Sequence, residues 1–177
     1  MRKNLITHIV VVAIFFLLVT LFRQLVDIAY LPLWIGGFVG AVLPDIDHLI
    51  YVYFLKPQEL TSQRVIRMVS KGDLNNTYQL LRSTTDERKK LIFHNALLQV
   101  VFVVFAYLVM SSSTNLFGQG MVLGFLIHLA VDQFVDLTKL DTLSGWFSNI
   151  SFTFDKTGYT LYWLANAVII LFLGLTL

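Results

Sequence analysis

The chain has four histidines, and each of them accompanies carboxylates or other histidines beside an apolar segment. The histidines are His8, His48, His94 and His128, and the accompanying acids are Asp45, Asp47 and Asp132. Ionisable side chains in or beside apolar segments are costly in a membrane, so they usually mark a functional site. Imidazoles and carboxylates together form the donor set of metal centres. This clustering therefore favours a metal site over a protein core.

The stretch from His128 to Asp132 places an imidazole and a carboxylate four residues apart, on one face of a helix. Such a pair can supply two metal ligands, or one ligand and the carboxylate that orients it. The alternative is a buried hydrogen-bonded pair that ties two helices together. The pair alone leaves both interpretations open.

A second cluster, Pro44-Asp45-Ile46-Asp47-His48, lies between apolar segments. Pro44 disfavours a helical conformation at the residue before it and can open a new helical turn. Asp45 and His48 would then share a face of that turn, while Asp47 would point elsewhere unless the backbone is irregular. The alternative is a simple cap at the membrane interface with two solvated acids.

The donor set predicts the kind of ion. The chain has no cysteine, which excludes a thiolate zinc site and a cysteine nucleophile. Oxygen and nitrogen ligands suit a divalent metal, with zinc first and manganese or iron as alternatives. Seven candidate groups exceed the needs of one tetrahedral ion, so we expect one or two ions. The predicted metal ligands are His8, Asp45, Asp47, His94, His128 and Asp132. The predicted catalytic groups are His48, as ligand or proton shuttle, and Asp47.

The composition predicts the fold that positions these groups. Of the 177 residues, 56% are hydrophobic and only 14% are charged, whereas a soluble domain carries roughly 25% charged residues. We therefore predict an all-α fold, a polytopic membrane helical bundle in one domain over residues 1–177. About five apolar segments are long enough to span a bilayer. They cover residues 5–22, 28–44, 91–110, 116–137 and 159–177.

The Lys and Arg distribution predicts the orientation, because positive charges favour cytoplasmic loops. With the N-terminus inside, twelve of the thirteen Lys and Arg residues are cytoplasmic, and only Arg23 lies outside. The histidines played no part in this assignment, yet all four, with their acids, then fall at one depth near the cytoplasmic face. We therefore expect them to converge.

Residues 57–90 form the main polar stretch, which we expect to be a cytoplasmic amphipathic loop on the membrane surface. Leu74, Tyr78 and Leu81 recur with the spacing of a short amphipathic helix, and Val65, Ile66 and Val69 indicate another before Gly72. Thr84 followed by Glu87 matches a capping box. This pattern predicts that the third span begins near residue 85 and runs without interruption into the lipid. Residues 138–158, rich in aromatic and small polar residues, are expected to form an interfacial or re-entrant cap.

Arg88, Lys89 and Lys90 precede the third span and could steer an anionic lipid headgroup. The usual enrichment of Lys and Arg in cytoplasmic loops also explains the presence of these three residues. A nucleic-acid partner is not expected, because the basic residues lie in a membrane-associated loop and form no compact basic face. Membrane lipids are the expected partners, and the oligomeric state is left open.

Four motifs in order resemble the YdjM-type inner-membrane proteins: Thr7-His8, PDIDH at 44–48, His94, and G-x-x-x-H-L-x-x-D from Gly124 to Asp132. The resemblance covers roughly residues 5–137. Members of that family are regarded as metal-dependent hydrolases and are associated with LexA regulation. The family pattern near the third span reads H-R-G-x-T-H-S, whereas residues 89–95 keep only its second histidine, His94. One ligand or substrate contact of that pattern therefore has no counterpart here.

The resulting hypothesis is a membrane-embedded metal-dependent hydrolase that acts on an ester or phosphoester, lipid-like, at the cytoplasmic leaflet. We expect it in the cytoplasmic (inner) membrane of a bacterium or archaeon. A divalent-cation transporter is an alternative, but transport sites lie near the bilayer midplane with access from both sides. A non-catalytic membrane stress-response protein with a structural metal is the third reading.

Overall fold

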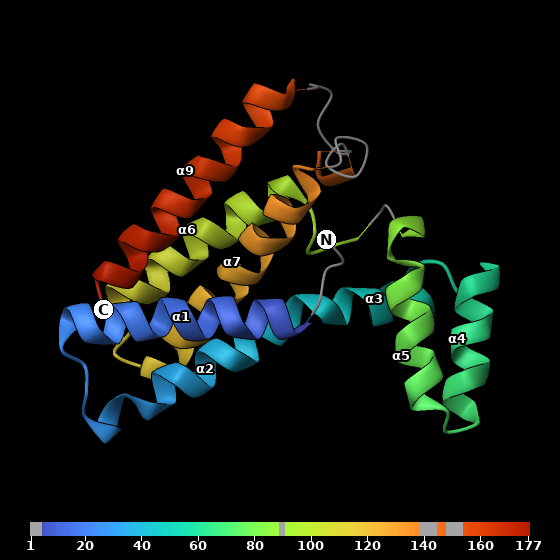
Figure 1. Ribbon diagram of the computed structural model, residues 1–177, viewed down its shortest axis with the longest axis horizontal. Helices are drawn as coiled ribbons and strands as arrows, with labels where there is room; N and C mark the ends of the chain where they lie inside the picture. Colours follow the sequence, from blue (N-terminus) through green and yellow to red (C-terminus); the bar gives the residue numbers. More distant parts are fainter. Residues whose placement is uncertain (1–4, 89–90, 139–144, 148–153) are drawn as a thin grey trace.

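The computed structural model describes residues 5–88, 91–138, 145–147 and 154–177. Within these residues every regular element is a helix, which confirms the predicted all-α fold (Figure 1). Four helical segments are long and apolar enough to cross a membrane: α1 (Leu5–Arg23), the run Ile28–Leu55, α7 (Leu116–Asp136) and α9 (Lys156–Leu175). A fifth apolar helix, α6 (Ala96–Ser112), is shorter. About five spans is therefore a fair description.

The second helical segment extends beyond the predicted end at residue 44. Helix α2 (Leu31–Val42) continues through a 3-10 turn (Leu43–Asp45) into α3 (Ile46–Ile50) and a π-helical turn (Tyr51–Leu55). Pro44 changes the hydrogen-bond pattern there without ending the helix, because at the start of a turn its missing N–H is not required. Asp45, Asp47 and His48 therefore lie within a continuous helical segment.

Helices α2 and α7 pack with their backbones in direct contact. A Cβ atom on Gly40 would lie 2.0 Å from the carbonyl oxygen of Met121, and one on Gly124 would lie 2.0 Å from that of Gly37. Only glycine allows this approach, which is the usual way for membrane helices to gain packing contacts. His128 is one turn beyond Gly124, and Asp45 is just over one turn beyond Gly40. The glycine contact therefore sets the distance between these two site residues.

The third apolar helix starts later than the capping-box pattern predicts, and that prediction is wrong. Thr85–Glu87 form an isolated 3-10 turn, and the hydroxyl of Thr84 donates to the carbonyl of Leu80 instead of capping a following helix. Helix α6 begins only at Ala96, where the side chain of Asn95 accepts the N–H of Leu97. His94 therefore lies just before the helix and not one turn inside it.

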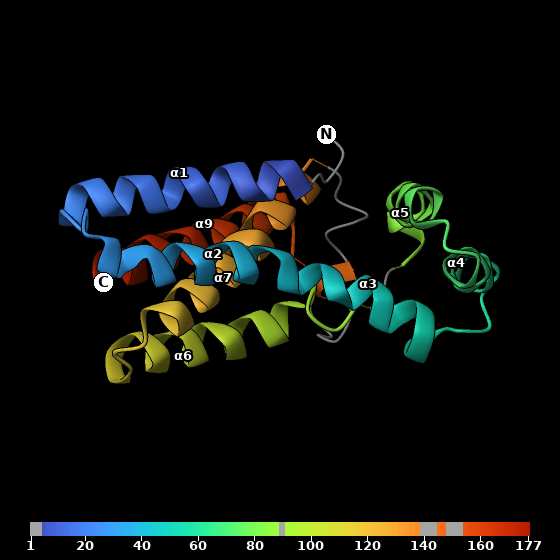
Figure 2. The same cartoon turned by 90° about the horizontal axis from the view of Figure 1, so that it is seen from below.

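Residues 57–90 contain two amphipathic helices, α4 (Leu60–Ser70) and α5 (Leu74–Ser83), as predicted. The two helices run side by side across the direction of α1 and α2 (Figures 1 and 2). Val65 of α4 is fully buried, whereas Leu74 and Tyr78 of α5 are exposed. A hairpin that lies across the direction of the spans and has an exposed apolar face suits a position at the membrane surface.

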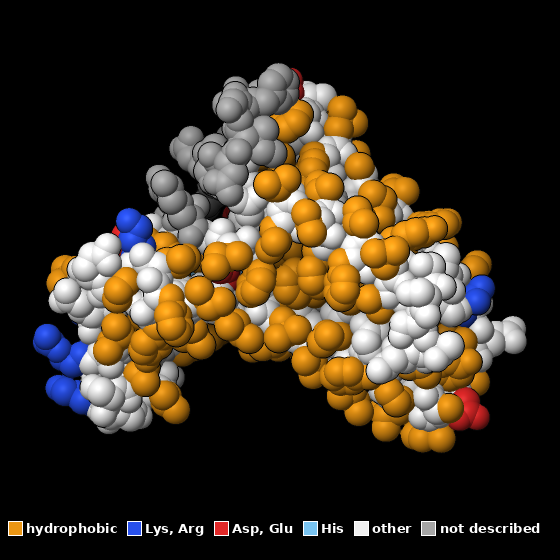
Figure 3. Space-filling view, turned by 180° about the vertical axis from the view of Figure 1, so that it is seen from behind, with side chains coloured by type: hydrophobic (Ala, Val, Ile, Leu, Met, Phe, Trp, Pro, Cys, Tyr) orange, Lys and Arg blue, Asp and Glu red, His pale blue; other side chains and the backbone are white. Residues whose placement is uncertain are grey.

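The surface between the hairpin and the bundle is largely apolar. In Figure 3, hydrophobic side chains form a broad continuous area, and most of the visible charged groups lie at the far end of the hairpin or at the opposite end of the bundle. Many large apolar residues of α1, α6 and α9 are exposed, including Leu18, Val101 and Phe172. Such a surface requires lipid around the bundle, because soluble monomers rarely expose large apolar areas.

The expected cap over residues 138–158 falls largely outside the described residues. Its described part includes Trp146 and Phe147, which are buried. Phe147 packs against Phe154, Tyr159 and Tyr162 in a cluster beside the start of α9. Whether the whole segment forms a cap stays a prediction.

The glycine contact yields a test of the fold. We expect Gly124→Ala to lower the free energy of unfolding in detergent by about 3 kcal/mol, because the new methyl group would overlap the backbone of α2. Gly118→Ala is the matched control on the same helix, since its Cβ would meet no atom closer than 3.8 Å. Thermal unfolding and size-exclusion profiles would report both effects, and equal stability of the two variants would contradict the proposed packing.

Candidate metal centre

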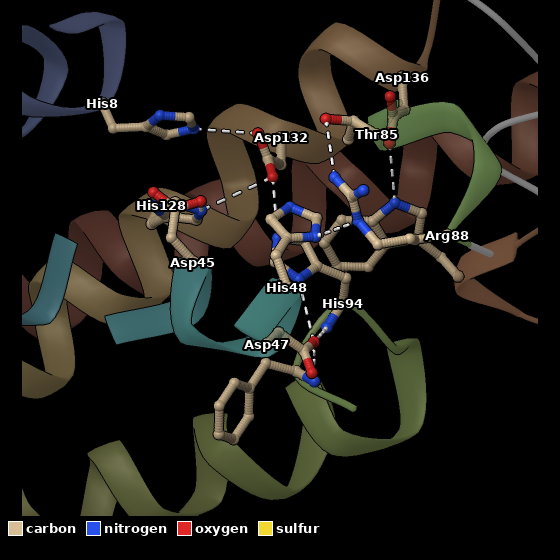
Figure 4. A network of polar contacts seen from close by, with 12 residues as sticks. His8, Asp45, Asp47, His48, Thr85, Arg88, His94, His128, Asp132 and Asp136 are labelled. Carbon is tan, nitrogen blue, oxygen red and sulfur yellow. Dashed lines mark hydrogen bonds and ion pairs between the residues drawn. The ribbon is translucent and has the colours of Figure 1, made fainter. Parts of the chain in front are cut away.

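Imidazoles and carboxylates from distant segments converge at one end of the bundle, as predicted from the sequence (Figure 4). His8 comes from the first turn of α1, Asp45 from the turn before α3, and His128 and Asp132 from α7. His94 comes from the segment that precedes α6. The rings of His8 and His128 are stacked, with centroids 4.0 Å apart. The predicted clustering is therefore present in three dimensions.

His128 has one nitrogen that is held by the backbone and one that has no hydrogen bond. Its Nδ1 lies 2.6 Å from the carbonyl oxygen of Ala41, which must accept a proton from the ring. The neutral ring therefore carries its lone pair on Nε2. That atom is buried and has no hydrogen-bond partner among the described residues. Metal-binding histidines typically show this arrangement, with the second nitrogen donating to a carbonyl.

Asp132 is the carboxylate that the histidines share. His8 Nε2 lies 3.0 Å from Asp132 Oδ1, and His94 Nε2 lies 2.9 Å from Oδ2. His128 Nε2 is 3.6 Å from the same Oδ2. The side chain of Asp132 is only 4% exposed. A buried carboxylate needs cations or donors around it, so each nearby imidazole must either carry a proton toward it or share a positive ion with it.

The spacing of these donor atoms fits a metal ion. Ligand atoms bound at about 2.0–2.1 Å with tetrahedral angles lie about 3.3 Å from one another. One nitrogen each from His8 and His128 and one oxygen from Asp132 lie within 4.8 Å of one another, and all three residues are buried. Asp45 Oδ1, 3.8 Å from His128 Nε2, offers a further donor on the open side. Within the described residues, the buried Nε2 of His128 has no hydrogen-bond partner, so this group of donors could hold a cation.

Asp47 has a different environment from the other acids. Its carboxylate accepts the backbone N–H groups of Ile92, Phe93 and His94, at 2.9, 2.6 and 3.3 Å. It also lies 3.3 Å from Nδ1 of His94. Its oxygens are thus occupied by donors from one short segment, on the side of α3 away from Asp45. In this arrangement Asp47 orients His94 through Nδ1, the ring nitrogen that does not face Asp132. The predicted roles of Asp47 as metal ligand and catalytic group stay predictions.

His48 lines the site and is held by Arg88. The guanidinium Nε of Arg88 donates to His48 Nδ1 at 3.2 Å. Arg88 also binds the hydroxyl of Thr84 and the carbonyl of Leu81, which anchors it to the hairpin. Burial lowers the pKa of Arg88, yet arginine starts far above neutrality and stays a donor. His48 Nδ1 must therefore accept, and the proton of the neutral ring is on Nε2.

The three residues predicted to meet a headgroup do not share one environment. Arg88 is 5% exposed and is engaged with His48 and the hairpin, so it does not face lipid. Lys89 and Lys90 lie outside the described residues. The basic residue that does line the site is Arg82, which the sequence analysis did not single out.

Sequence reasoning also missed a second layer of polar residues around the site. Trp146 Nε1 donates to Asp136 Oδ2 at 3.0 Å, and its ring packs against that of His94 with centroids 5.4 Å apart. Asp136 lies one turn beyond Asp132 on α7, and this spacing was a signal that could have identified it. Its partner lies ten residues further along the chain, where no local pattern links the two.

A pair of glutamines forms a further polar contact deeper in the bundle. The side-chain amides of Gln99 and Gln133 donate to each other at 3.3 and 2.6 Å, and Tyr162 donates to Gln99 at 2.9 Å. Such reciprocal contacts stabilise helix association in lipid. They tie α6, α7 and α9 together and so hold Asp132 and the segment before α6 in place.

The site opens into a pocket of about 260 Å³. One wall carries His8, Asp45, His48 and Asp132. Leu5 and Leu49 add apolar surface from α1 and α3. The remaining lining residues come from the hairpin and the turn that follows it, and they are Tyr78, Leu81, Arg82 and Thr85. Asp45 and His48 thus share a face of the helical segment, as their spacing predicts, while Asp47 points away from the pocket.

The contrast between Asp47 and Asp45 can be tested with the metal removed. In the presence of a chelator, Asp47→Ala should lower the free energy of unfolding by about 3 kcal/mol, because three buried or partly buried N–H groups lose their acceptor. Asp45→Ala should change it by no more than about 0.5 kcal/mol, because that side chain is 40% exposed. Denaturant unfolding would measure both, and a small effect of Asp47→Ala would contradict its anchoring role.

The comparisons agree with the motifs on which the resemblance rests. The model of the YdjM inner membrane protein family matches residues 3–175, which is nearly the whole chain. No curated protein and no solved structure shows a significant match. The family match covers His8, the 44–48 cluster, His94 and the His128–Asp132 pair together. The chain belongs to the YdjM inner membrane protein family.

Proposed function

We propose that this protein is a membrane-embedded, metal-dependent hydrolase that cleaves an ester or phosphoester at one face of the membrane. The observation that carries the proposal is the buried, unpartnered Nε2 of His128, 3.6 Å from a carboxylate oxygen of Asp132. A buried nitrogen lone pair next to a buried carboxylate is unfavourable without a cation between them. The pocket beside it is lined by His8, Asp45 and Asp132, so a substrate could approach the ion from that side.

His8, His128 and Asp132 would hold the ion, with His94 and Asp45 as the nearest additional donors. Nitrogen and oxygen donors without sulfur favour zinc, followed by manganese or iron. A bound divalent ion would polarise the scissile group as a Lewis acid and activate water at neutral pH. The triad accounts for one ion, and a second ion is not required by the described geometry.

His48 would act on the substrate through its Nε2–H. Arg88 has donors only, so it holds His48 Nδ1 as an acceptor and places the ring proton on Nε2. In this state His48 can donate a hydrogen bond to an oxygen that gains negative charge during ester cleavage. Arg88 is therefore a positioning residue, and His48, which lines the pocket, is the candidate catalytic residue.

The location of the site favours hydrolysis over transport. The ligands lie at the end of α1 where the chain enters the bundle, and the pocket opens toward the amphipathic hairpin. Farther along the bundle, Phe16, Leu33, Leu123 and Leu126 are fully buried in a packed core. A transport path would have to cross this core, whereas an enzyme needs access from one side only.

Metal content tests the proposal directly. The full chain purified in mild detergent should contain about one tightly bound divalent ion, measured by elemental analysis. His128→Ala should abolish this binding, because it removes a buried ligand that the backbone orients. His48→Leu should keep the ion but lower turnover of model esters and phosphoesters about 100-fold, as expected when one donor to the developing charge is lost.

Metal content, hydrolysis and a transport assay together separate the possible outcomes. Failure of the wild-type protein to retain any divalent ion would refute the metal centre. Metal that is retained without hydrolysis of any ester or phosphoester would favour a structural ion. Uptake of zinc into vesicles that Asp132→Ala abolishes would instead identify a transporter.

The predicted orientation can be tested on the native background, because the chain has no cysteine. Single cysteines would be introduced at Ser70, on the hairpin, and at Thr114, between α6 and α7. With the N-terminus inside, a membrane-impermeant thiol reagent applied to intact cells should label Thr114→Cys and leave Ser70→Cys unlabelled. The reverse pattern would place the pocket on the outer face and contradict the positive-inside assignment.

A further inference from the structure

The pocket has two chemically different walls. The metal-binding side chains form one wall, and the hairpin contributes the other through Tyr78, Leu81, Arg82 and Thr85. Tyr78 and Leu81 are apolar or largely so, whereas the guanidinium of Arg82 and the hydroxyl of Thr85 are polar. A ligand that fills the pocket therefore meets a cation and apolar side chains on one side and the reactive centre on the other.

The size of the pocket limits what can enter it. Its volume of about 260 Å³ is slightly below the roughly 300–1,000 Å³ of typical small-molecule sites. It has room for a phosphate-sized group and a short connecting segment, but not for a complete lipid with its chains. A longer substrate must therefore leave part of its length outside the pocket.

The exposed apolar residues of the pocket lining are suited to an apolar chain that remains outside. Leu5, Leu49 and Tyr78 line the pocket and are 36%, 43% and 49% exposed. Leu5 is the first residue of the first membrane-spanning helix, so this part of the lining lies at the end of that span. An alkyl chain that leaves the pocket along these residues would stay in apolar surroundings.

Arg82 is a cation available to a ligand. It is exposed at the surface of α5, it lines the pocket, and within the described residues it has no ion-pair partner. Arginine binds carboxylates and phosphates through paired N–H donors. Arg88, by contrast, has its donors committed to His48 and the hairpin. The charge that the pocket offers to an anion thus comes from Arg82.

We propose that the substrates of this site are anionic amphiphiles, with the anionic headgroup bound by Arg82 and the alkyl chain passing over Leu5, Leu49 and Tyr78 into the lipid. The inference rests on the proposed hydrolase function, because it assigns a substrate class to the same pocket. It makes the hairpin the element that selects the substrate, while the helical bundle carries the reactive groups.

Native mass spectrometry of the full chain in a nonionic detergent tests the proposal, with zinc present and dodecyl phosphate as the probe. Arg82→Gln should weaken dodecyl phosphate binding about tenfold, and Arg82→Lys should restore part of it. The matched control is Arg64→Gln, an exposed arginine on α4 that does not line the pocket and that should bind the probe like the wild type. Tyr78→Ser should weaken binding of dodecyl phosphate but not of inorganic phosphate.

Three results would overturn the proposal. Equal binding by Arg82→Gln and Arg64→Gln would show that Arg82 does not hold the anion. Inorganic phosphate that binds as tightly as dodecyl phosphate would identify a free anion, and not an amphiphile, as the ligand. Neutral dodecyl alcohol that binds as tightly as dodecyl phosphate would exclude recognition of the charge.

The same spectra keep this proposal separate from the proposed function, because they count bound metal and bound probe independently. Dependence of binding on Arg82 in a protein without metal would contradict the metal centre alone. A protein that retains metal and shows no dependence on Arg82 would contradict the substrate class alone.

Discussion

The buried carboxylate of Asp132 is the constraint on which the site depends. A carboxylate that is 4% exposed within an apolar bundle is unfavourable unless cations or hydrogen-bond donors surround it. The nitrogens of His8, His94 and His128 approach it from three separate segments of the chain. Because the histidines belong to different segments, their contacts with Asp132 link α1, α7 and the segment before α6 into one structure.

Two of these imidazoles are held in place by contacts that do not involve a metal. The carbonyl of Ala41 fixes His128, and Asp47 fixes the segment that carries His94. The close packing of α2 on α7 brings Ala41 within reach of His128, since glycines on both helices let the backbones touch. The site is therefore organised by the same contact that organises the bundle, which favours binding without large rearrangement of the ligands.

Much of this arrangement could be predicted from the sequence, and the remainder depends on contacts between distant residues. Apolar length and periodicity located α1, α7, α9 and the two helices of the hairpin, because these patterns are local. Histidine and aspartate clustering located His8, His128 and Asp132. The start of α6 was misplaced because Asp47, more than forty residues away, takes up the N–H groups of residues 92–94. The burial of Arg88 and the partnership of Trp146 with Asp136 likewise depend on the assembled fold.

The late start of α6 has a consequence for the surrounding bilayer. Its seventeen residues make a helix of about 26 Å, which is shorter than the roughly 30 Å of a typical hydrocarbon core. A short span is accommodated by local thinning of the bilayer or by flanking polar side chains that reach the headgroups. His94 lies directly before this short helix, so the response of the lipid to the mismatch would determine how close the headgroups come to it.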